Sequence, residues 1–101
     1  MLYLVETKGS MARANVIDAG EGPGPMFAKI VERFHPEALY GNPTRRQIFM
    51  VVNLDTPADI AELMFILSWF AGTDPTFTPL MRPEGFGEAI ANAKRIVSPP
   101  A

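Results

Sequence analysis

Ten prolines divide this chain of 101 residues into short windows that contain none. Proline lacks a backbone N–H and its ring clashes with the preceding helical turn, so it is rare inside helices and central strands. The secondary structure must therefore lie mostly between the prolines, in windows 1–22, 26–35, 44–56, 58–74 and 84–98. A chain of this length forms one core. We expect a single domain over residues 1–97 and a tail over 98–101.

Four segments have the composition of strands. They are residues 2–7, 37–40, 46–54 and 76–81. The third segment is apolar on both of its faces, which is typical of a strand in the centre of a sheet. The fourth contains Pro79, which restricts it to a sheet edge.

Three segments show the apolar spacing of amphipathic helices. They are residues 26–34, 58–71 and 86–97. Pro25 suits the first position of the first helix, and Thr56 and Gly72 are suited to begin and end the second. Residues 11–20 fit either a short helix or a loop, because no residue provides a firm cap. The glycines and prolines from Gly20 to Pro25 predict a loop.

The resulting order is β-α-β-β-α-β followed by an extra C-terminal helix. We therefore predict an α+β fold, a ferredoxin-like plait with an antiparallel sheet. In this plait the first and third strands are central, and the second and fourth are at the edges.

The second predicted helix carries more apolar side chains than one buried stripe accommodates. The side chains that lie off the stripe are Phe65, Ile66 and Trp69. The third strand adds a second apolar face, with Phe49 and Val51. Either the C-terminal helix or residues 11–24 cover the surplus, or these five residues form an interface. We predict the interface, and hence at least a homodimer.

Composition excludes several classes of function. There is no cysteine and only one histidine, so we expect no metal site and no cofactor. A net charge of −2 argues against a nucleic-acid partner. The longest strongly apolar run, residues 63–72, is half of what a bilayer requires, and the N-terminus lacks the basic region of a signal peptide. We expect no membrane partner and a cytoplasmic location.

Several segments resemble the dimeric α+β barrel superfamily, which includes muconolactone isomerase-like proteins and antibiotic-biosynthesis-type monooxygenases. The likeness lies in the opening strand Leu2–Val5, the central strand Arg46–Val52, the helix entry Asp55–Asp59 and the final strand. It covers residues 1–7 and 25–97, and residues 8–24 depart from it. The resemblance implies that two sheets pack face to face and that a small ligand lies between sheet and helices. No family motif matches residue by residue, so no catalytic residue is carried over.

Two functional hypotheses follow. The first is a site for a small hydrophobic or aromatic molecule, in a cofactor-independent isomerase or monooxygenase. The second is a non-catalytic ligand-sensing or assembly subunit. His35 is the one weak catalytic candidate, and a helix-terminal histidine without catalytic function is its alternative. The candidate ligand-binding residues are Tyr3, Tyr40, Arg46, Gln47 and Asn53.

The expected binding surface combines two strands. We expect one face of the first strand (Tyr3, Val5 and Thr7) to adjoin one face of the third (Gln47, Phe49, Val51 and Asn53). Such an apolar surface with scattered polar groups is typical of a small-ligand pocket. The sequence leaves open whether the protein is an enzyme, which ligand it binds and which pathway it serves.

Overall fold

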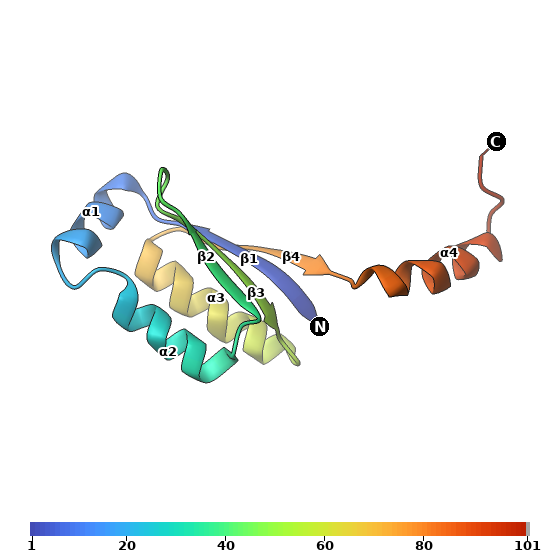
Figure 1. Cartoon of the computed structure of the whole chain (residues 1–101), viewed down its shortest axis with the longest axis horizontal. Helices are drawn as coiled ribbons and strands as arrows, with labels where there is room; N and C mark the ends of the chain where they lie inside the picture. The colour runs from blue at the N-terminus through green and yellow to red at the C-terminus, as the bar shows by residue number, and fades with distance from the viewer. Residues whose placement is uncertain (101) are drawn as a thin grey trace.

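The computed structural model describes residues 1–100, and its elements follow the predicted order with one helix added (Figure 1). The four strands are β1 (Leu2–Lys8), β2 (Ala38–Asn42), β3 (Gln47–Asn53) and β4 (Thr76–Leu80). The α-helices are α1 (Met11–Ala19), α2 (Gly24–Phe34), α3 (Pro57–Ala71) and α4 (Phe86–Lys94), and a 3-10 turn, η1 (Pro83–Gly85), precedes α4.

The strands form one open antiparallel sheet in the order β2-β3-β1-β4. The expectation that the first and third strands are central is confirmed, as is the place of the proline-containing strand at an edge. The protein therefore has an α+β fold that is compatible with a ferredoxin-like plait.

Helices α2 and α3 cover one face of the sheet, and the hydrophobic core lies between them and the strands (Figure 1). Alternation along β1 and β3 directs every second side chain toward the helices. The buried cluster consists of Val5, Ile30, Phe34, Met50, Val52, Leu54, Leu63 and Leu67. Arg33 on α2 links the two helices through ion pairs of 3.2 Å to Asp59 and 3.1 Å to Glu62.

Helix α3 has the boundaries that its sequence predicts. The hydroxyl of Thr56 accepts a hydrogen bond from the Asp59 backbone N–H at 3.1 Å, and Pro57 follows in the first turn. Gly72 ends the helix in the left-handed conformation at φ 75°, which glycine adopts without steric cost.

Residues 11–19 are helical, and our view that no residue caps them is wrong. The Ser10 hydroxyl accepts a hydrogen bond from the Arg13 N–H at 3.2 Å, which is an ordinary N-cap. The predicted loop is correspondingly shorter, because Gly24 and Pro25 already belong to α2.

The C-terminal helix ends at Lys94 rather than at residue 97 and does not cover α3. It projects away from the sheet beyond the end of β4, and none of its residues is buried (Figure 1). The alternative in which α4 shields the surplus apolar side chains is therefore wrong for this conformation. Within residues 1–100, no helix combines the length and apolar character needed to cross a bilayer.

Candidate functional site

A cavity of about 290 Å³ lies between the sheet and the helices, at the end of the sheet where β2 and β3 are joined. Its wall is formed by the sheet, the helices α1, α2 and α3, and the β2–β3 turn. The lining residues are Thr7, Gly9, Ala14, Ile17, Asp18, Pro23, Met26, Phe27, Gly41, Asn42, Pro43, Arg46, Gln47, Ile48, Leu67, Phe70 and Ala71.

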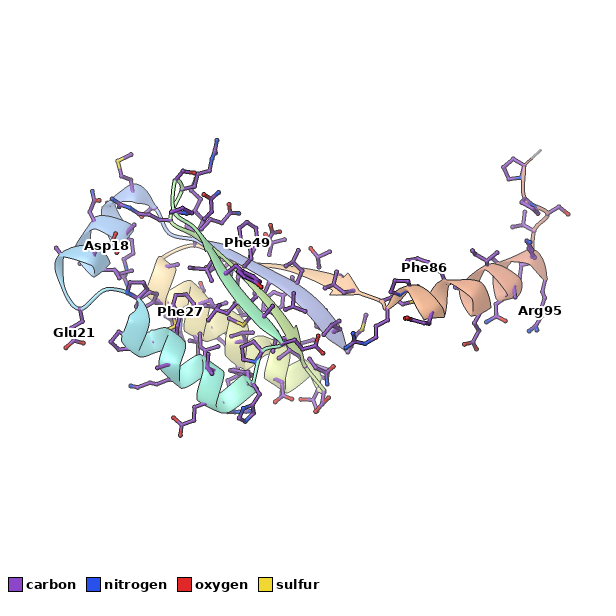
Figure 2. The ribbon with its side chains drawn as sticks, in the orientation of Figure 1. Asp18, Glu21, Phe27, Phe49, Phe86 and Arg95 are labelled. Carbon is purple, nitrogen blue, oxygen red and sulfur yellow. The ribbon has the colours of Figure 1, made fainter. Side chains whose placement is uncertain are left out.

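The wall of the cavity is mostly apolar. Met26 and Phe27 come from the first turn of α2, Leu67 and Phe70 from the last turns of α3, and Ile48 from the sheet. Figure 2 shows Phe27 at the start of α2 and Asp18 on α1, the two helices at this end of the molecule. A concave apolar wall with few polar groups is typical of a small-molecule site.

Thr7 is the buried polar residue of this wall. Its side chain lies on the helix-covered face of β1, and the residue is 8% exposed. Its hydroxyl oxygen is buried and has no hydrogen-bond partner among the described residues. A buried hydroxyl without a partner costs about 1–3 kcal/mol, so pairing of this one with a water or a ligand in the cavity would be favourable.

Charged groups line the rim of the cavity. The Arg46 guanidinium donates a hydrogen bond of 2.6 Å to the Asn15 side-chain oxygen, and its Nε lies 3.4 Å from a carboxylate oxygen of Asp18. Both partners belong to α1, so Arg46 joins this helix to the β2–β3 turn. Arg46 itself has φ 50°, which explains why β3 begins at Gln47 and not at residue 46.

A second arginine fixes α1 from the other side. Arg13 donates hydrogen bonds to the backbone carbonyls of Trp69, at 2.6 Å, and Phe70, at 2.9 Å. These carbonyls lie in the last turn of α3, where no intrahelical N–H remains for them and a cation is favourable. Helix α1 is thereby held against both sides of the cavity entrance.

Replacing Arg46 with asparagine tests this arrangement, since asparagine tolerates a positive φ better than most residues. The ion pair is about half exposed, so we expect global stability to change by less than about 1 kcal/mol. Amide hydrogen exchange in α1 should nevertheless become several-fold faster because one of its two attachments is lost. Unchanged exchange across residues 11–19 would show that Arg46 does not hold the helix.

The structure distributes the predicted ligand-binding residues over different regions. Arg46 and Gln47 line the cavity. Tyr3 packs against the core at the opposite end of β1, with its ring 6.2 Å from that of Phe77. Tyr40 and Asn53 are exposed.

The expected pairing of faces between the first and third strands is wrong. In the observed register Val5 lies opposite Met50, and Glu6 lies opposite Phe49. Directly opposed residues of antiparallel strands share a face. Tyr3, Val5 and Thr7 therefore face the helices, whereas Phe49 and Val51 lie on the other face with Leu2 and Leu4.

His35 ends α2, where it adopts the left-handed conformation at φ 48°. It is exposed and does not line the cavity, which adjoins the opposite end of α2. Its position matches that of a helix-terminal histidine.

The predicted interface residues occupy two surfaces. Phe49 and Val51 lie on the sheet face that α2 and α3 leave uncovered (Figure 1). Phe65 and Trp69 point outward from α3, their rings 5.4 Å apart and Trp69 72% exposed. Ile66 does not point outward as expected but packs against the core.

The sequence reasoning missed the contribution of α1 to the site. Ala14, Ile17 and Asp18 form part of the cavity wall, whereas the sequence left residues 11–20 open between a helix and a loop and assigned them no part in the site. The available signal was Ser10, because serine is among the residue types favoured at helix N-caps.

Comparisons with known proteins give no functional lead: no protein-family model and no curated protein matches this sequence. Over residues 1–100, histidine and acidic side chains form no group of three that could hold a metal ion.

Proposed function

We propose that this protein binds a small hydrophobic or aromatic molecule in the cavity between α1, α2, α3 and the sheet. The observation that carries the proposal is the buried, unpaired hydroxyl of Thr7 in an otherwise apolar wall. A ligand with a polar group directed at Thr7 supplies the missing hydrogen bond, while its apolar part contacts Phe27 and Leu67.

The size of the cavity limits the class of ligand. Its volume of about 290 Å³ is near the lower end of the range for small-molecule sites. An apolar cavity of about 150 Å³ accommodates one benzene ring. The expected ligand is therefore a molecule of one or two rings, or an aliphatic chain of similar volume, with one hydroxyl or carbonyl group.

The wall favours binding over turnover. Asp18 is the carboxylate among the lining residues, and it is ion-paired with Arg46. The lining residues include no second carboxylate and no histidine, so they supply no pair of acid and base groups. We therefore place a ligand-binding or ligand-sensing subunit ahead of an isomerase or monooxygenase.

The proposal includes a homodimer of the dimeric α+β barrel type. The uncovered face of the sheet is here called the open face, and its polar residues include Glu6, Thr76 and Thr78. It also carries a group of apolar side chains, Leu2, Leu4, Phe49, Val51 and Leu80. A sheet face exposed to water is normally polar. Pairing of two open faces would remove these side chains from water and produce two stacked sheets, as the sequence resemblance implies.

Replacing Thr7 with valine tests the site, because the two side chains have the same shape. The variant should be more stable than the wild type by about 1 kcal/mol in the absence of ligand, since it removes an unpaired buried hydroxyl. Its affinity for 2-naphthol or coumarin, measured by calorimetry, should be about three- to tenfold weaker because one hydrogen bond is lost.

A second variant fills the cavity. Ala14 is buried in its wall, so Ala14→Leu should abolish binding of both probes. Ala12→Leu places the same side chain on the exposed surface of α1 and should leave binding unchanged. If neither probe, nor any molecule in a screen of one- and two-ring alcohols, lactones and acids, stabilises the wild type, the proposed function is wrong.

A further inference from the structure

The C-terminal helix has an apolar stripe and no surface of its own chain to bury it against. Phe86 and Ile90 lie one turn apart on one side of α4, and Val97 lies in the turn that follows the helix. Phe86 and Ile90 are each about half exposed, and Val97 is 65% exposed. Figure 2 shows Phe86 at the start of a helix that projects away from the sheet and the other α-helices, with Arg95 just past its end.

A helix of this length is not stable alone. Isolated helices shorter than about 12–15 residues are marginal in water, because nucleation is costly and few hydrogen bonds repay it. Helix α4 has nine residues, and its N-terminal residue has no side-chain cap. Its helical conformation therefore requires packing of its apolar stripe against another surface.

Residues 81–97, here called the arm, consist of η1, α4 and the residues on either side of them. Two contacts near the start of the arm set its direction. Arg82 forms an ion pair of 2.8 Å with Glu37, the residue that precedes β2. A side chain at Gly85 would lie 2.8 Å from the Met81 sulfur, so the turn η1 packs closely against the preceding residue. These contacts direct α4 outward rather than back over its own sheet.

The whole chain is more extended than a compact monomer of the same length. Its radius of gyration is 17.3 Å, against about 13 Å for a compact chain of this length. Its accessible surface is 7099 Å², against about 5,700 Å² for a folded monomer of its mass, an excess of roughly 1,400 Å². A standard interface buries about 800 Å² on each partner, so the excess is enough for a stable dimer.

We infer that α4 is an exchanged arm whose apolar stripe packs against a second copy of this chain. The open face also carries apolar side chains that the chain does not cover. A second copy of the chain could therefore bury both the stripe on α4 and the open face. This inference goes beyond the proposed ligand site, which lies at the other end of the sheet. It adds a second contact to the proposed dimer and assigns a role to residues 81–97.

Charged substitutions in the stripe provide the first test. Phe86→Glu with Ile90→Glu should weaken self-association tenfold or more in sedimentation experiments, because two buried apolar contacts are replaced by charges. Ala91→Glu with Asn92→Glu adds the same number of acidic side chains on the other side of α4 and should leave association unchanged. An equal effect of both pairs, or of neither, would overturn the assignment of the stripe.

An isotope-filtered NOE experiment decides whether the contact is between chains. In an equal mixture of ¹³C-labelled and unlabelled wild-type protein, Phe86 and Ile90 of the labelled chain should show NOEs to protons of the unlabelled chain. NOEs to the same chain alone would mean that α4 folds back, and a monomer with an unprotected α4 would mean that no second copy binds it. Either result overturns the exchanged arm.

The proposals for the ligand site and for the arm can be contradicted independently of each other. The variant with Phe86→Glu and Ile90→Glu should bind 2-naphthol with wild-type affinity, because no residue of α4 lines the cavity. Loss of association with retained ligand binding is the expected result. Wild-type association in this variant would overturn the arm while leaving both the cavity and open-face pairing standing.

Discussion

Replacing Leu63 with alanine is expected to lower the free energy of unfolding by about 2–5 kcal/mol. Leu63 is fully buried at the centre of α3 and belongs to the core cluster between the helices and the sheet. The substitution removes three carbon atoms and leaves a space that the surrounding side chains fill only in part. Since small domains are stable by about 5–15 kcal/mol in total, a loss of this size brings the protein close to unfolding at 37 °C.

Urea unfolding followed by circular dichroism measures this effect, at one fixed protein concentration because the proposed dimer would make the stability depend on concentration. Ala61→Ser, on the exposed side of the same helix, should change the stability by no more than about 0.5 kcal/mol. If Leu63→Ala has as small an effect as Ala61→Ser, the packing of α3 against the sheet is not as described.

Introducing two lysines on the open face, Phe49→Lys with Val51→Lys, should weaken dimer formation by a factor of about 100 or more. Two facing sheets would bring four lysines into an apolar interface, and buried unpaired charges are strongly unfavourable. The isolated subunit should keep its fold, because both side chains point away from the core and lysine can extend its stem along the sheet.

Sedimentation equilibrium over a range of concentrations tests this prediction. Ala28→Lys with Ala61→Lys adds the same charge on exposed positions of the helical layer and should leave the dimer intact. A wild-type protein that stays monomeric at high concentration would contradict open-face pairing, as would a lysine variant that dimerises normally. Helical and sheet content by circular dichroism shows whether the variant has folded.

The sequence predicted those parts of the fold that local rules determine. Thr56 and Gly72 act through hydrogen bonds and backbone angles within a few residues, so the boundaries of α3 are visible in the sequence. Apolar residues on both faces of segment 46–54 likewise predicted a central strand, and β3 does lie between β2 and β1.

Features that depend on distant contacts were beyond such reasoning. Helix α1 depends on Arg13, whose partners are carbonyls more than 50 residues away. The register between β1 and β3 determines which side chains of β1 share a face with Phe49. A shift of one residue would exchange the two faces of β1. The ion pair between Arg82 and Glu37, which directs α4 outward, also joins residues far apart in the sequence.

The residues of the candidate site were likewise predicted only in part. Arg46 and Gln47 were recognised, because polar residues beside an apolar strand stand out in the sequence. The role of Thr7 depends on its being enclosed by three helices, which only the assembled fold reveals.

Pro79 in β4 affects how this protein behaves at high concentration. Pro79 lies opposite Tyr3 of β1. Because proline has no backbone N–H, this edge strand has one hydrogen-bond donor fewer. A chain that exposes this much apolar surface is at risk of open-ended strand-by-strand growth into fibres, and a proline on the edge blocks that growth. We therefore expect the proposed association to give closed assemblies of fixed size, and light scattering should reveal a defined particle rather than a continuously growing one.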